Sequence, residues 1–140
     1  MAQKILVTGN LPKEVMDLLT EQFEVKAQSE DRPLDRQDLL AFIGDRDGLL
    51  SMITDAVDEE LLSRAPRLQM IANMGVGYNN IDVGAATRRG IPVSNTPGVL
   101  TDATADLAFT LILAVARRVV EGDKRVRTGQ FTFWAPFLFL

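Results

Sequence analysis

Cysteine and histidine are both absent from the 140-residue sequence, and tryptophan and tyrosine occur once each. Without cysteine the chain forms no disulfide and offers no thiolate nucleophile. Without histidine it lacks the most frequent general acid or base and the most frequent metal ligand of proteins. The sequence therefore excludes thiol chemistry and histidine-dependent catalysis or metal binding within this chain.

A strong charge of one sign and long apolar runs are also missing. The formal net charge is −4, with both signs spread along the chain, so there is no basic patch and we expect no binding to nucleic acid. The most apolar segment, ATADLAFTLILAVA at residues 103–116, contains Asp106 and is shorter than the roughly 20 residues of a membrane span. We predict no membrane association and a helix buried on most of its faces. The N-terminus is too short and too polar for a signal peptide, so a cytoplasmic location is expected.

Short apolar stretches alternate with helical patterns over the first hundred residues. The stretches are continuous runs, which is typical of strands in a parallel sheet covered on both faces. They predict an α/β fold with a flavodoxin-like (Rossmann-like) five-stranded parallel sheet in the order 2-1-3-4-5. Asp55 is expected to cap the third helix. Strands are predicted at 4–9, 23–29, 48–54, 68–74 and 91–96, and helices at 11–23, 33–44, 55–66 and 80–90.

The pattern changes after residue 100. One long helix is predicted from Thr101 or Asp102 to about Gly122 or Gly129, followed by an apolar arm, FTFWAPFLFL, at residues 131–140. The arm holds four of the seven phenylalanines and the only tryptophan. Because chain ends are normally polar and solvated, we expect another surface to cover this arm. We predict self-association through residues 131–140 or through the helix that starts at residue 101.

The stretch NMGVGYNN, residues 73–80, begins like the glycine-rich loop that binds dinucleotides. That fingerprint, G-x-G-x-x-G, needs a third glycine where this chain has Asn80, and it belongs to the first strand unit rather than the fourth. We therefore favour a site where backbone N–H groups and the positive N-terminal end of the next helix bind a carboxylate. The alternative is a tight turn whose glycines are needed only for positive φ.

The block NMGVGYNNIDVGAATRRGIPVSNTPGVLTDATADLAFTLILAVARR closely resembles the D-isomer-specific 2-hydroxyacid dehydrogenases, above all the glyoxylate/hydroxypyruvate reductase branch. The resemblance implies hydride transfer between NAD or NADP and a small 2-oxo or 2-hydroxy acid. It implies that residues 1–100 are the N-terminal part of a substrate domain, that 101–129 form an interdomain helix, and that the arm at 130–140 leads into a nucleotide-binding domain. The family's catalytic residues lie beyond residue 140, so we expect this chain to be inactive alone.

The same resemblance implies which residues bind the substrate. The backbone N–H groups of Val76 and Gly77 are expected to hold its carboxylate, in agreement with the anion site argued from the glycines. The loop of Leu50, Ser51 and Met52 is expected to lie over the substrate and to contribute to its selection. Two structural alternatives stay open: Met52 as a core residue at a strand end, and Ser51 as a purely structural residue.

Contacts with the cofactor and with a second subunit are also implied by the resemblance. Thr104 is expected to contact NAD or NADP near the nicotinamide, where Val76 is a second candidate. Trp134 is expected to reach the active site of the neighbouring subunit in a homodimer. The alternatives are a Thr104 hydroxyl that only bonds a backbone carbonyl, and a Trp134 that packs on its own subunit.

Other proteins of similar length and fold fit the sequence less well. A phospho-receiver needs an acidic pair after the first strand and a lysine after the fifth, where this chain has VTGN and VSNTPG. A flavodoxin needs a Ser/Thr-rich phosphate loop after the first strand, which is absent. An NAD-sensing regulatory protein of the same fold and a phosphoglycerate dehydrogenase-like enzyme stay open as alternatives.

Overall fold

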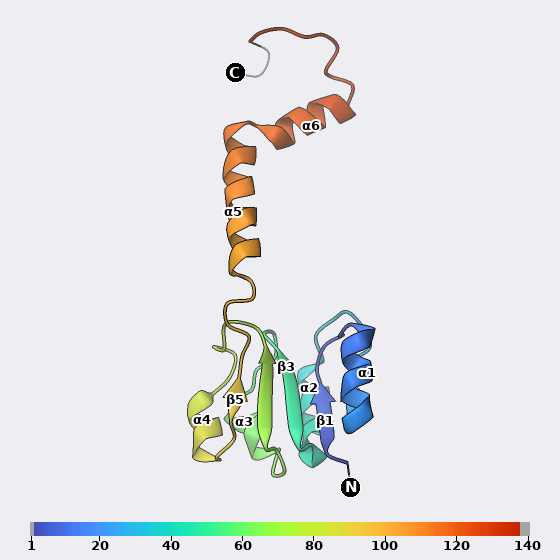
Figure 1. Ribbon diagram of the computed structural model, residues 1–140, viewed down its shortest axis with the longest axis vertical. Helices are drawn as coiled ribbons and strands as arrows, with labels where there is room; N and C mark the ends of the chain where they lie inside the picture. The colour runs from blue at the N-terminus through green and yellow to red at the C-terminus, as the bar shows by residue number, and fades with distance from the viewer. Residues whose placement is uncertain (1, 138–140) are drawn as a thin grey trace. The chain divides into compact units, whose positions relative to one another are not determined.

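The computed structural model describes residues 2–137 (Figure 1). The chain divides into two compact units, Met1–Gly98 and Val99–Leu140. The first unit contains the whole sheet with its covering helices, and the second contains two helices and the arm. The candidate site described below belongs entirely to the first unit.

A single parallel sheet forms the centre of the first unit, and its strand order, β2-β1-β3-β4-β5, is the predicted one. The central strands β3 and β4 are paired along their full length, from Gly48 opposite Met70 to Met52 opposite Met74. The carboxyl ends of the two strands therefore lie side by side at one edge of the sheet. The strands are β1 (Lys4–Val7), β2 (Glu24–Ala27), β3 (Gly48–Met52), β4 (Met70–Met74) and β5 (Val93–Ser94).

Helices lie on both faces of this sheet, but unequally. Three of them, α2 (Arg36–Phe42), α3 (Glu59–Ser63) and α4 (Val83–Arg88), pack against the face that carries Leu6, Leu49 and Ile71, and α2 and α3 are seen behind the sheet in Figure 1. A short 3-10 turn, η1 (Ile43–Asp45), extends α2. The buried core of the unit lies on this side: Leu6, Leu39, Ile43, Leu49, Val57, Leu61, Leu62, Ala65, Leu68, Ile71, Ile81, Ala85, Ala86 and Ile91.

The opposite face of the sheet is covered mainly by α1 (Lys13–Gln22). Leu19 of α1 and Phe23, which follows it, line one side of a hollow of about 400 Å³, and the strand residues Ile5, Leu50 and Ala72 line its floor. These strand residues are only half-buried, whereas their sequence neighbours on the other face are buried. The core of this unit is therefore one-sided.

The start of α3 differs from the prediction. Asp58, not Asp55, is the N-cap residue, and its carboxylate accepts a hydrogen bond of 3.0 Å from the backbone N–H of Leu61. Asp55 is buried three residues earlier and accepts hydrogen bonds from the Thr8 hydroxyl and from the backbone N–H of Met52. The sequence offers two aspartates near the start of this helix. Asp58, which also pairs with the Arg36 guanidinium, occupies the N-cap position.

The second unit contains two helices where one was predicted. α5 (Thr101–Ala116) and α6 (Val119–Arg127) are separated at Arg118, which has a left-handed backbone conformation with φ of 51°. Leu100 occupies the N-cap position of α5, and neither Thr101 nor Asp102 provides a capping hydrogen bond. A left-handed residue ends the i→i−4 hydrogen bonding of a helix, so the single long helix was a wrong prediction.

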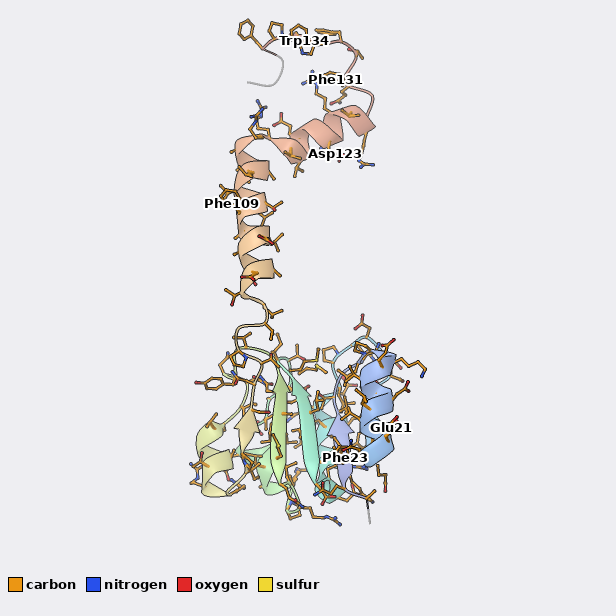
Figure 2. All side chains as sticks on the ribbon, in the orientation of Figure 1. Glu21, Phe23, Phe109, Asp123, Phe131 and Trp134 are labelled. Carbon is orange, nitrogen blue, oxygen red and sulfur yellow. The ribbon has the colours of Figure 1, made fainter. Side chains whose placement is uncertain are left out.

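The apolar surfaces of this unit are exposed in the described chain. No residue of α5 is buried, so the prediction of a helix buried on most of its faces is wrong for this chain. Phe109 projects from α5, and Phe131 and Trp134 project from the arm (Figure 2), where the Trp134 side chain is 77% exposed. The last three positions of the predicted arm, 138–140, lie outside the described residues. Within residues 2–137, no helix combines the length and the apolarity that crossing a membrane would require.

Candidate functional site

The candidate site lies where β3 and β4 end, at the carboxyl edge of the sheet. Ligands of open parallel sheets bind beyond this edge. The loop from Gly75 to Asn80 follows β4, and the loop from Ile53 to Asp55 follows β3. Because Met52 and Met74 are paired in register, the two loops leave the sheet next to each other. Leu50, Ser51 and Met52, which were predicted as a loop over the substrate, are the last residues of β3. The segment predicted to bind a carboxylate therefore lies beside the end of this strand.

Three consecutive carbonyl groups of the first loop are held by donors of the protein itself. The Gly75 carbonyl accepts a 2.9 Å bond from the backbone N–H of Thr96. The side-chain amide of Asn95 donates a 2.9 Å bond to the Val76 carbonyl. The side-chain amide of Asn73 donates a 2.8 Å bond to the Gly77 carbonyl. The loop is therefore fixed through its oxygen atoms.

Fixing these carbonyls also fixes the direction of the N–H groups. The C=O and the N–H of one trans peptide point in opposite directions, and the described residues contain no cis peptide. Anchoring the carbonyls of Gly75, Val76 and Gly77 thus turns the N–H groups of Val76, Gly77 and Tyr78 away from their anchors. None of these three N–H groups has an acceptor among residues 2–137. We call the N–H groups of Val76, Gly77 and Tyr78 the amide cradle.

The two glycines of the loop are not explained by positive φ. Among the described residues, the glycines with positive φ are Gly90, Gly98 and Gly129, so the interpretation of Gly75 and Gly77 as positive-φ turn residues is wrong. Close approach explains Gly75, where an added Cβ would lie 2.2 Å from Cγ2 of Ile53 and 3.4 Å from Nδ2 of Asn73.

The helix after the loop does not add its N-terminal charge to the cradle, as the sequence had led us to expect. α4 begins only at Val83, and its N-terminus is already capped by the Asp82 carboxylate, which accepts a 2.8 Å bond from the N–H of Ala85. The sequence-based helix start at residue 80 was three residues too early. The cradle therefore consists of loop amides alone, without a helix dipole behind them.

A network of buried polar side chains lies beneath the two loops. Asn73 is 2% exposed, and its Oδ1 accepts bonds from Ser51 Oγ at 3.2 Å and from Asn80 Nδ2 at 3.3 Å. Asn80 Nδ2 also lies 3.2 Å from the carbonyl oxygen of Met52 and 3.1 Å from that of Asp55. The network thus connects the cradle loop with the loop after β3.

Asp55 is the buried acid of this region. Its Oδ2 accepts a 2.7 Å bond from the N–H of Met52 and a bond from the Thr8 hydroxyl. Burial raises the pKa of Asp55 above its ordinary value, and the two hydrogen bonds offset part of that increase. Within the described part of the chain, no group of three or more acidic, histidine or cysteine side chains could hold a metal ion.

The structure places the predicted substrate-loop residues in three different environments. Leu50 lies on the sheet face that α1 covers, where it lines the hollow beside that helix. Ser51 is fully buried and donates to Asn73, which favours the structural alternative for its side chain. The Met52 side chain extends over Gly9, where an added Cβ would lie 2.3 Å from the Met52 Cε. The role of these residues toward a substrate stays a prediction.

The remaining predicted contacts belong to the second unit. Thr104 lies in the first turn of α5 and its backbone N–H bonds the carbonyl of Leu100. Trp134 is exposed on the arm. The sequence analysis missed Asn73, Asn80 and Asn95 as structural parts of the site. Asn73 lies two residues before Gly75, Asn80 three residues after Gly77, and Asn95 outside the loop, so no local spacing marked them as its partners.

The comparison with protein families identifies the family of the chain. A family model of the catalytic domain of D-isomer specific 2-hydroxyacid dehydrogenases matches residues 5–133. The chain belongs to this family. The resemblance seen in the sequence is thereby confirmed.

Several relatives of the 2-hydroxyacid dehydrogenase family are similar over the whole chain. A glyoxylate reductase from Pyrococcus furiosus is 48% identical over 100% of this chain, which covers 43% of that relative. A solved structure of a Thermus thermophilus protein has 41% identity and a TM-score of 0.90, and the match covers 99% of this chain and 44% of that one. The chain thus spans less than half of the length of these relatives.

A further similar solved structure contains bound ligands. It is an NADPH-dependent glyoxylate/hydroxypyruvate reductase from Sinorhizobium meliloti in complex with NADP and malonate. It has 33% identity and a TM-score of 0.73, with a match over 94% of this chain and 40% of that one.

Proposed function

We propose that this chain supplies the substrate-carboxylate site of an NAD(P)-dependent dehydrogenase that acts on a small 2-oxo or 2-hydroxy acid of the glyoxylate or hydroxypyruvate type. The observation that carries the proposal is the amide cradle. Its N–H groups are turned away from the carbonyl anchors and have no acceptor within the described residues. A carboxylate provides two acceptor oxygens on one rigid plane, which two or three adjacent N–H groups can bind together.

The chemistry of the cradle suits an acid that must be oriented and not merely attracted. Each N–H bond to a charged acceptor contributes about 1.5–3 kcal/mol. Backbone N–H groups carry no net charge and no rotatable bonds of their own, so they hold the carboxylate in one orientation. The reacting C2 atom is bonded directly to this carboxylate and is therefore oriented with it. This arrangement supports the proposed roles of Val76 and Gly77.

The nicotinamide cofactor supplies the hydride when it is bound, but the loop at residues 75–80 does not fit its pyrophosphate. The N-terminus of α4 is capped by its own Asp82, and Asn80 stands where the third glycine would be needed. We propose that most of the cofactor is held by a nucleotide-binding domain of the whole protein. Thr104 and the exposed Val76 side chain are proposed as contacts near the nicotinamide.

The exposed apolar arm supports a proposed homodimer in which Trp134 reaches the neighbouring subunit. The side chains of Phe131, Phe133 and Trp134 are all exposed in the single chain, and contiguous apolar surface of this kind marks interaction sites. Light scattering at high concentration tests this part of the proposal. A monomer would contradict it.

The carboxylate site is tested by NMR on the ¹⁵N-labelled chain. Glyoxylate and pyruvate should shift the amide signals of Val76 and Gly77 in a saturable way, whereas pyruvamide, which replaces the carboxylate by a neutral amide, should not. Equal shifts with pyruvate and pyruvamide, or shifts spread over the sheet, would refute the site. We also expect the chain alone not to oxidise NADH or NADPH with glyoxylate, because the hydride carrier's main binding site is assigned elsewhere.

A further inference from the structure

We propose that Asn73 and Asn80 are positioning residues that hold the amide cradle and the segment of Met52 as one unit. The inference rests on the proposed function, since it concerns how the same carboxylate site keeps its geometry. Both asparagines act through other residues and neither is assigned a contact with the substrate. What carries the inference is a continuous path of hydrogen bonds from one loop to the other.

Asn73 forms the cradle side of this path. It is almost completely buried at the end of β4, and its Nδ2 donates to the Gly77 carbonyl at 2.8 Å. Its Oδ1 accepts from Ser51 and from Asn80. The partners of Oδ1 are donors and the partner of Nδ2 is an acceptor, so only one orientation of the Asn73 amide satisfies all of them. Asn73 therefore determines where the Gly77 carbonyl lies and, through the peptide plane, where the Tyr78 N–H points.

Asn80 forms the other side of the path. Its Nδ2 lies within hydrogen-bond distance of the carbonyl oxygens of Met52 and Asp55 as well as Asn73 Oδ1. The backbone carbonyl of Asn80 accepts a bond of 2.9 Å from the backbone N–H of Val57. The backbone of Met52 is consequently held at its oxygen by Asn80 and at its nitrogen by Asp55.

The energetics of Asn80 indicate that it is kept for a purpose beyond packing. Its Oδ1 is buried and has no hydrogen-bond partner among the described residues. An unpaired buried acceptor costs free energy. A side chain that merely filled this space could be apolar and would avoid that cost. The amide is useful here because it connects two loops that the proposed function brings to one substrate.

The experiment compares three charge-matched variants of the full 140-residue chain. Asn73→Asp and Asn80→Asp keep the size of the side chain but remove the Nδ2 donor. Asn79→Asp adds the same charge to an exposed neighbour in the same loop, which has no part in the network. Pyruvate is titrated against each ¹⁵N-labelled chain, and its Kd is taken from the signals of Val76 and Gly77. Urea unfolding of each variant gives its stability separately.

The expected result is a Kd at least about tenfold weaker in Asn73→Asp and Asn80→Asp than in Asn79→Asp, a ratio typical of losing one hydrogen bond that positions a charged ligand. A merely structural role would lower the resistance to urea but leave the Kd of the folded chain equal to that of Asn79→Asp, and this outcome would overturn the inference. Should an aspartate variant fail to fold, Asn80→Ser, which removes the bridge without adding charge, must show the weaker Kd. A native chain that does not bind pyruvate at all refutes the proposed function, and the inference with it.

Discussion

Adding a methyl group at Gly75 should destabilise the protein, whereas adding one at Gly77 should not. The Cβ of an alanine at position 75 would lie 2.2 Å from Cγ2 of Ile53, more than an ångström closer than the 3.4 Å at which ordinary contact begins. At position 77 the nearest atom, Oδ1 of Asn79, would be 3.5 Å away. The two substitutions are chemically identical and lie two residues apart in the same loop.

The magnitudes follow from this difference in space. Overpacking costs about 1–3 kcal/mol, and replacing glycine by alanine where φ permits it stabilises by about 0.4–1 kcal/mol through the unfolded state. Gly75→Ala should therefore lower the free energy of unfolding by about 0.5–2 kcal/mol. Gly77→Ala should leave it unchanged or raise it by up to about 1 kcal/mol.

Urea unfolding followed by circular dichroism measures both values, and a double-mutant cycle tests the cause. Ile53 is 62% exposed, so Ile53→Ala alone should change stability by no more than about 0.5 kcal/mol. In that background Cγ2 is gone, and Gly75→Ala should then cost little. An unchanged cost of Gly75→Ala in the Ile53→Ala background would refute the steric explanation.

Two further predictions concern the aspartates beside the site. Because the pKa of Asp55 is raised in the folded state, the native chain binds the proton more tightly than the unfolded chain, so the buried charge reduces stability once the pH exceeds the folded pKa. The free energy of unfolding of Asp55→Asn, relative to that of the native chain, should therefore increase from about pH 3 to about pH 7. Urea unfolding at several pH values measures this difference. A difference that stays constant or decreases as the pH rises would contradict the prediction. Asp58→Ala, which removes both the cap of α3 and the contact with Arg36, should cost about 1–2 kcal/mol. Asp58→Asn, which keeps a capping oxygen, should cost clearly less in the same thermal or urea assay.

The sheet could be predicted because its signals are local and strong. Short stretches such as residues 5–7 and 48–50 are apolar at successive positions, which is typical of parallel strands with helices on both faces, although only one face of this sheet carries a buried core. The break at Arg118 had no such signal, because an arginine in the left-handed conformation is not favoured by its own side chain. The exposure of α5 could not be predicted either, since an apolar helix is buried only where a second surface is present to cover it.

The site could be predicted only in part, for a related reason. The two glycines marked the loop that carries the amide cradle, but the N–H directions depend on which other groups of the chain bind the carbonyls. The donors to Val76 and Gly77 come from Asn95 and Asn73, at sequence separations of 19 and 4. The residue types of Val76 and Gly77 do not indicate which side chain will bind their carbonyl groups. Asp55 was misplaced as a helix cap because its real partner, Thr8, is 47 residues away.

The anchored carbonyls also bear on the speed of recognition. Since the protein's own donors already hold the loop, the acid proposed to bind there would not have to organise the backbone, and little conformational entropy would be lost on binding. Its capture would then need no slow rearrangement of the loop and would proceed at the rate of encounter. Acids that differ in the group attached to C2 would enter equally fast and be distinguished by how long they stay.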